Sequence, residues 1–246
     1  MKCLSRQDIE AIATRVVNAY YRLPELQGQP IHRIDPELLL TKVLGLNIEY
    51  YHLSLDNSIL GATSASEMGI EVYDNADNEA IYFLDGNTVL VEKDLKEDAT
   101  QKGRCNFTLA HEGSHQILKM LYPREYGVNS KSPKLHFYRA NSEKNKPISD
   151  WEEWQANALG SAILLPREKI EKGMFMFELG EKITMLNKIV DSRVYDRFKD
   201  LALFLGVSKT ALAIRMKQFG LLENDYLDDP YRILDIYYDG GVGYER

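Results

Sequence analysis

The residues with the clearest capacity for chemistry are His111, Glu112 and His115, which form an H-E-x-x-H pattern within residues 107–118. On a helix, positions four apart lie on the same face, so the two imidazoles can bind one zinc ion. Glu112 would then reach a water at the metal and act as a general base, as in metallopeptidases. The alternative is that the two histidines have this spacing by chance on an ordinary core helix.

The residues around this pattern favour a helix that is buried on one side. Gly113 is costly inside a helix, which suggests that another backbone passes close to it. The helix is expected to end near Leu121, because Pro123 follows. The apolar stripe at helical spacing consists of Phe107, Ala110, Ser114, Ile117, Leu118 and Leu121, and the two histidines flank it.

A second helix is expected to supply a third ligand. Ser149 and Glu152 form an S-x-x-E capping box, which gives Glu152 a structural role and leaves Glu153 available. Glu153 and Asn157 are four residues apart, and small residues follow that suit close helix packing. Catalytic zinc keeps three protein ligands, so Glu153 is predicted to be the third. Without the histidines, Glu153 would be interpreted as a surface carboxylate.

Composition limits the class of protein. The chain has 246 residues, 44% of them hydrophobic, which is enough for a packed core. Its net charge of −7 argues against a protein whose whole surface binds nucleic acid. Its two cysteines, Cys3 and Cys105, suit a reducing compartment. No signal peptide and no membrane span are recognisable, so a cytoplasmic location is expected.

The first ninety residues are expected to form helices and then a small, mostly antiparallel sheet. Ser5 caps an amphipathic helix that runs to Arg22, with Asp8 three residues after the cap. A second, short helix follows over 35–43, and Gly45 can end it. Strand-like segments, separated by Asp-Asn and Asp-Gly-Asn turns, cover 47–53, 61–63, 69–73, 80–84 and 88–91.

Residues 122–148 are rich in basic residues, asparagine, serine and proline. A connection of this length is typically a solvated loop or a lid over a functional site. Three residues in it, Tyr126, His136 and Tyr138, are candidates to stabilise an oxyanion. The sequence leaves the choice between loop and lid open.

Taken together, the two motifs resemble the ImmA/IrrE family of metallo-endopeptidases. The resemblance is carried by F-T-L-A-H-E-x-x-H at 107–115, E-x-x-A-N-A at 153–158 and L-L-P at 164–166, and it covers roughly residues 35–220. It implies zinc held by His111, His115 and Glu153, with Glu112 as the catalytic base. It also implies an α+β fold with a zincin-like core, and cleavage of a protein substrate, typically a helix-turn-helix repressor. Gly113-Ser114 departs from the usual Leu-Gly, and the gap from His115 to Glu153 is longer than the family pattern.

The C-terminal part is expected to be helical. Helices are predicted over 167–179 and 181–190, and residues 196–222 have the spacing of a helix-turn-helix pair, with Ser208 capping the second helix. A metallopeptidase domain over 1–195, followed by these helices and a tail over 196–246, is the expected organisation. The rival hypotheses are a DNA-binding regulator that uses 196–222, where Lys209, Thr210, Arg215 and Lys217 are a sparse basic set, and a protein that binds a repressor without cutting it.

Overall fold

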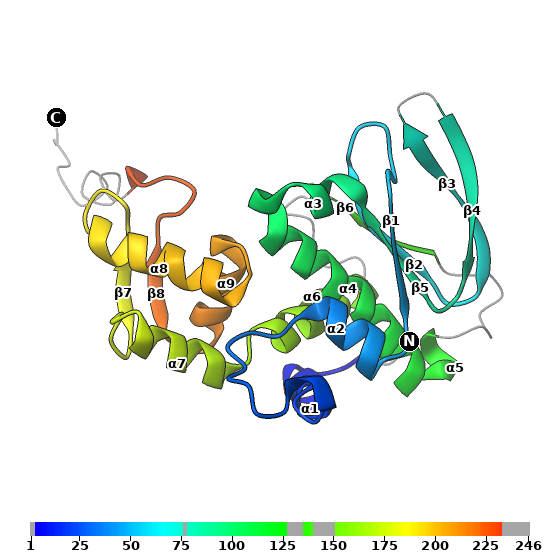
Figure 1. Ribbon diagram of the computed structural model, residues 1–246. Coiled ribbons are helices and arrows are strands. Elements are labelled where there is room, and N and C mark those ends of the chain that lie inside the picture. Colours follow the sequence, from blue (N-terminus) through cyan, green and yellow to red (C-terminus); the bar gives the residue numbers. More distant parts are fainter. Residues whose placement is uncertain (1–2, 76–77, 127–134, 140–150, 233–246) are drawn as a thin grey trace, which may run out of the picture. The chain divides into compact units, whose positions relative to one another are not determined.

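The computed structural model describes residues 3–75, 78–126, 135–139 and 151–232 (Figure 1). The chain is a mixed α/β protein with a small mixed sheet, consistent with the expected α+β class. It divides into two compact units, Met1–Pro166 and Arg167–Arg246. The boundary expected at residue 195 lies inside the second unit, because strand β7 (Ile183–Leu186) pairs with strand β8 (Leu222–Asp225) across it.

The N-terminal helices form as their caps predict. Helix α1 (Arg6–Tyr20) begins with a capping box, in which Ser5 Oγ accepts a hydrogen bond from the Asp8 backbone and Asp8 accepts one from the Ser5 backbone. After a 3-10 turn, η1 (Pro24–Leu26), Asp35 caps helix α2 (Pro36–Leu38), which continues as a π-helix, η2 (Leu39–Val43). Gly45 follows with φ +66°, a conformation that favours glycine.

Four strands make the main sheet, in the order β1-β5-β2-β6. Strand β1 (Asn47–Tyr51) is parallel to β5 (Thr88–Glu92), whereas β2 (Ile59–Ser64) is antiparallel to both β5 and β6 (Leu135–Arg139). Strand β6 comes from the segment predicted to be a loop or lid, and that prediction is wrong for residues 135–139, which pair with β2. Residues 127–134 and 140–148 of the segment lie outside the described residues.

A long hairpin of β3 (Glu67–Asn75) and β4 (Asn78–Asp85) covers one face of the sheet. Ala62 of β2 packs there with Leu53, Ile70, Leu84 and Leu90, and the β6 side chains Leu135 and Phe137 pack against the same cluster. The hairpin lies on the far side of the sheet from the helices in Figure 1. Burial of these apolar side chains is the main force that joins the hairpin to the sheet.

The opposite face of the sheet carries helix α4 (Lys102–Leu121), reached through α3 (Lys93–Glu97) and η3 (Ala99–Gln101) and followed by α5 (Pro123–Tyr126). As predicted, α4 ends at Leu121. Gln116 on α4 donates hydrogen bonds to Thr63 Oγ1 (2.6 Å) and to the Ser64 carbonyl (2.9 Å) of β2. These buried bonds fix the helix against the strand.

Helix α6 (Trp151–Leu164) crosses α4, and Gly160 lies where the two helices approach each other closely. A Cβ on Gly160 would lie 3.1 Å from backbone atoms of Ala110 and His111, which is closer than ordinary van der Waals contact, so glycine suits this approach best. The expectation that another backbone passes Gly113 is wrong. Gly113 instead faces the Leu40 side chain, whose Cδ1 would lie 2.8 Å from an added Cβ.

The second unit contains α7 (Arg167–Met176), β7, α8 (Ser192–Leu205), α9 (Lys209–Gln218) and β8. The prediction of a helix over 181–190 is wrong in part, because residues 183–186 form strand β7, which pairs in parallel with β8. Gly206, with φ +71°, ends α8, and Ser208 Oγ accepts the Ala211 N–H to begin α9, as predicted.

None of the helices in the described ranges combines the length and the apolar character needed to cross a lipid bilayer.

The α4–α6 crossing predicts a stability change. Gly160→Val should lower the free energy of unfolding by about 1–3 kcal/mol, because the added methyl groups meet backbone that cannot rotate away. Urea denaturation followed by circular dichroism measures this change. Ala158→Val, on a half-buried position of the same helix, is the control for placing a β-branched side chain in α6 away from the crossing. Equal losses in the two variants would contradict a special role for the crossing.

Candidate metal centre

His111 and His115 lie one turn apart on α4, and both are buried. Their Nε2 atoms are 3.2 Å apart, so the two rings converge on one point. Two nitrogen atoms this close cannot both donate a hydrogen to each other. The arrangement suits a shared electron-pair acceptor such as a metal ion.

Glu153 at the start of α6 completes the group. Its Oε2 lies 3.2 Å from His111 Nε2, and its Oε1 lies 3.2 Å from His115 Nε2. The three side chains offer ligand atoms within 4.8 Å of one another, as a single metal ion requires. The three residues predicted from the two motifs are therefore brought together by the crossing of α4 and α6.

Asn157, one turn after Glu153, orients the first histidine. The Asn157 amide oxygen lies 3.2 Å from His111 Nδ1. With the proton on Nδ1 donated to Asn157, the lone pair of Nε2 faces Glu153 and His115. Contacts of this kind fix the tautomer and the ring orientation of metal-binding histidines.

Glu112 is the least compensated charge of the site. It is buried, and among the described residues neither carboxylate oxygen has a hydrogen-bond partner. Burial raises the pKa of Glu112 well above its usual range, and the nearby charge of Glu153 raises it further. A buried carboxyl group without a partner is an unusual cost, and such groups are often found where chemistry takes place.

Gly61 of β2 makes the room for Glu112, a contact that was not predicted from the sequence. A Cβ on Gly61 would lie 2.7 Å from Thr108 Cγ2 and 2.9 Å from both Cγ and Oε1 of Glu112. The only signal available was a glycine inside a strand, which often marks a close approach.

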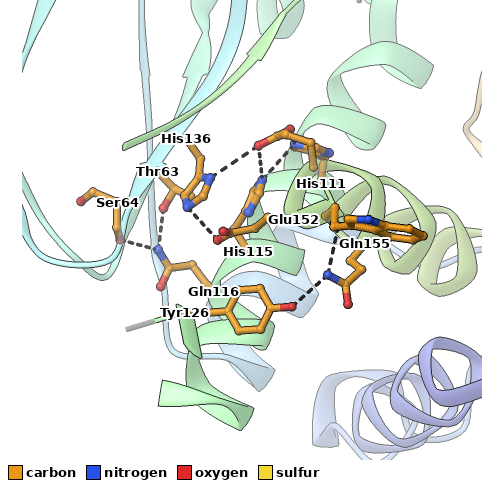
Figure 2. A network of polar contacts seen from close by, with 11 residues as sticks. Thr63, Ser64, His111, His115, Gln116, Tyr126, His136, Glu152 and Gln155 are labelled. Atoms are coloured by element: carbon orange, nitrogen blue, oxygen red, sulfur yellow. Dashed lines mark hydrogen bonds and ion pairs between the residues drawn. The ribbon is translucent and has the colours of Figure 1, made fainter. Parts of the chain in front are cut away.

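His136 of β6 lies beside His115 (Figure 2). Its ring stacks on that of His115, with centroids 4.0 Å apart and planes at 20°. Its Nε2 lies 3.1 Å from Glu152 Oε1, and its Nδ1 lies 3.4 Å from Glu153 Oε1. Burial opposes a charge on His136, but the hydrogen bonds with Glu152 and Glu153 outweigh it and raise its pKa to about 9.

Glu152 has a function that the capping-box interpretation did not include. Its side chain is buried and forms the ion pair with His136. Ser149, the other half of the predicted box, lies outside the described residues. The helix start therefore offers two neighbouring carboxylates, one toward the centre and one behind His136.

The two tyrosines proposed with His136 differ in position. The ring of Tyr138 lies 4.5 Å from that of His111, so this residue borders the site. Tyr126 is buried elsewhere, and its hydroxyl accepts a hydrogen bond from Gln155 Nε2 (2.9 Å), as Figure 2 shows. Gln155 in turn accepts the Leu4 N–H, so Tyr126 belongs to a structural network and is a poor candidate for an oxyanion donor.

The contacts of Glu153 and His115 determine which protonation state each side chain favours. Burial alone would raise the pKa of Glu153, but hydrogen bonds with His111, His115 and His136 outweigh it and hold that pKa far below the usual range. Burial and the charge of His136 lower the pKa of His115 to about 3, which favours a neutral ring. Neutral imidazoles and an ionised carboxylate are the forms in which these groups bind metals.

A further histidine and carboxylate group lies away from this centre. His52 Nδ1 is 2.8 Å from Glu92 Oε1, and Asp94 is nearby. The other Glu92 oxygen accepts the Leu53 N–H (2.8 Å). These bonds satisfy Glu92 and tie the chain after β1 to the end of β5.

The basic residues considered for DNA contact in 196–222 are mostly engaged in the second unit. Arg215 is buried, and its guanidinium lies 4.2 Å from the centroid of the Phe219 ring. Lys217 forms an ion pair with Asp225 (2.5 Å). Lys209 donates a hydrogen bond to the Tyr195 hydroxyl (2.8 Å). Such a set provides little free positive charge for phosphate contacts.

No protein-family model and no curated protein matches the chain.

The contact between Asn157 and His111 predicts a change in metal affinity. Asn157→Ala should weaken divalent metal binding about 10–100-fold, because the His111 ring loses the partner that fixes its orientation. Competition with a chromogenic chelator measures the affinity. Ser161→Ala, one turn further along α6, is the control and should bind metal as the parent does. An unchanged affinity in Asn157→Ala would contradict the orienting role.

The tight contact at Gly61 predicts a second effect. Gly61→Ala should leave His111, His115 and Glu153 in place but displace Glu112, because the methyl group overlaps the glutamate side chain. We expect a loss of about 1–3 kcal/mol of stability with metal affinity reduced much less than in Asn157→Ala. Thermal unfolding and the same chelator competition check both values. A Gly61→Ala protein with parental stability would contradict the packing argument.

Proposed function

We propose that this protein is a zinc-dependent endopeptidase of the ImmA/IrrE type. The observation that carries the proposal is the convergence of two His Nε2 atoms and the Glu153 carboxylate beside the buried carboxyl group of Glu112. The position of β2 and β6 against α4, with α6 crossing, fits the zincin-like core that the resemblance implies.

The donor set fits zinc. Two imidazole nitrogens and one carboxylate are a common catalytic zinc set, and three protein ligands leave a coordination position open. Other divalent transition metals accept the same donors, so the choice of zinc rests on this donor set together with the resemblance.

Each residue of the proposed centre would have a defined part in the reaction. A bound zinc ion would supply Lewis-acid activation of water and of the scissile carbonyl, and its charge would favour the ionised form of Glu112. Glu112 would accept a proton from the attacking water on a carboxylate oxygen and later donate it to the leaving amine nitrogen. Its buried position excludes bulk water from that transfer.

His136 and Tyr138 support the proposed reaction from β6. His136 is held between Glu152 at Nε2 and Glu153 at Nδ1, so its protonated ring would place positive charge beside the centre, where it would stabilise negative charge on the oxygen of the scissile carbonyl. Tyr138 borders the other side through its contact with His111. Either residue would act where negative charge develops.

The substrate proposed from the resemblance is a protein, most specifically a helix-turn-helix repressor whose cleavage derepresses mobile-element or stress genes. We place the enzyme in the cytoplasm, where a free and exposed thiol such as Cys3 stays reduced. The competing DNA-binding hypothesis has less support, because Arg215 is buried and Lys217 is paired.

Three variants separate metal binding from catalysis. His111→Ala and Glu153→Ala should each lose most bound zinc, because each removes one of three ligands. Glu112→Gln should keep zinc and lose at least about 100-fold in cleavage rate, because the amide cannot accept a proton. Bound zinc is measured by mass spectrometry of the purified proteins. Cleavage is measured by the mass of the repressor encoded beside the gene after incubation.

Two results would contradict the assignment. Full zinc retention in both His111→Ala and Glu153→Ala would remove them as ligands, and unimpaired cleavage by Glu112→Gln would remove the base. A repressor that binds tightly yet keeps its mass with the zinc-loaded parent would favour a binding protein that does not cut.

A further inference from the structure

A groove in the first unit lies on the face of the sheet opposite to the metal centre. Its volume is about 670 Å³, and it is formed by the β3–β4 hairpin, the segment between β1 and β2, and strand β6. Leu135 and Phe137 are the residues that β6 contributes. Because side chains alternate along a strand, these two face the groove while His136, between them, faces the metal centre.

The groove exposes large apolar side chains. Leu55, Ile81 and Phe83 line it, and their relative exposures are 68%, 64% and 75%. Contiguous apolar surface of this kind, in a concave site, commonly marks a place where another molecule binds. Gly69 pairs with Phe83 across the hairpin, and the Ile81 and Phe83 side chains lie over it: an added Cβ would be 3.1 Å from Ile81 Cγ2 and 3.5 Å from Phe83 Cε1.

The charge of the groove indicates what kind of molecule it fits. Asp56 and Glu71 are the charged residues of its lining, and both are acidic. An apolar groove with acidic side chains complements a segment that carries large apolar residues next to a lysine or arginine. A bare hydrocarbon ligand would leave these carboxylates unmatched.

Strand β6 connects the groove to the metal centre. His136 and Phe137 are consecutive residues, so the two sites are separated by the thickness of one strand. A polypeptide that lies along β6 in an extended conformation directs successive side chains to opposite faces. Such a segment can fill the groove with alternate side chains while its backbone stays close to the metal centre.

We propose that this groove is a specificity site for the polypeptide substrate, and that it selects an extended segment with large apolar side chains at alternate positions and a basic residue two positions further on. The inference rests on the proposed endopeptidase function. It adds a sequence preference that the metal centre by itself does not impose.

The test measures peptide binding without turnover, in the Glu112→Gln protein. The probe is a fluorescein-labelled heptapeptide, Ser-Leu-Ser-Leu-Ser-Lys-Ser, and its binding is followed by fluorescence anisotropy at low salt. Replacing both leucines by serine should weaken binding at least about tenfold, through lost apolar burial. Replacing the lysine by glutamate should weaken it about threefold, through repulsion by Asp56 and Glu71.

Variants of the groove locate the binding. Phe83→Ser should weaken the leucine peptide about tenfold, because the phenyl ring is the most exposed part of the lining. Leu121→Ser, an exposed leucine at the end of α4 outside the groove, is the matched control and should bind as the parent does. Glu71→Lys should reverse the charge preference and favour the glutamate peptide, whereas Glu67→Gln, on the same strand outside the lining, should leave the preference unchanged.

The outcomes distinguish this inference from the proposed function. Equal binding by Phe83→Ser and Leu121→Ser, or an unchanged charge preference in Glu71→Lys, would overturn the groove assignment and leave the metal centre untouched. Binding that follows these variants in a protein that cuts no repressor would support the groove and count against the endopeptidase.

Discussion

The close crossing of α4 and α6 at Gly160 is the contact on which the candidate site depends. Because Gly160 has no side chain, the α6 backbone approaches that of Ala110 and His111. Glu153 and Asn157 precede Gly160 on α6 by two turns and about one turn, so the approach carries both toward the histidine face of α4. One carboxylate can then lie 3.2 Å from two imidazoles.

The sheet contributes the second constraint, which is the exclusion of water. Gly61 brings β2 against Glu112, while Gln116 fixes the helix to Thr63 and Ser64. Strand β6 adds His136, which is stacked on His115 and held by Glu152. The helices therefore supply the candidate ligands, and the strands determine the dielectric environment that raises the pKa of Glu112.

Features that depend on residues close together in the sequence could be predicted, whereas features that depend on residues far apart could not. The α4 motif, the caps of α1 and α9, and the end of α4 at Leu121 depend on residues a few positions apart, and the structure agrees with each. Glu153 was predicted because a capping box was assigned to Glu152, but both carboxylates contact imidazoles, Glu152 on His136 and Glu153 on His111 and His115. Strand β6 pairs with β2 across more than seventy residues, and β7 pairs with β8 in the same non-local way, so neither followed from local pattern. The contribution of Glu152 also required that pairing, because His136 is brought to it by β6.

The charges of the centre explain why such a site favours a cation. Glu152 and Glu153 are compensated by imidazoles, whereas Glu112 is buried with no hydrogen-bond partner among the described residues. Leaving an ionised carboxylate uncompensated in the interior costs several kcal/mol, and a nearby cation reduces that cost. Burial favours the neutral form of Glu112 when no cation is near, and a bound cation would favour the ionised form, so metal affinity would be coupled to the protonation of Glu112. Gly61 packs β2 against Glu112 and Gly160 brings α6 to α4, so two separate glycine contacts place a buried carboxyl group beside the three candidate ligands.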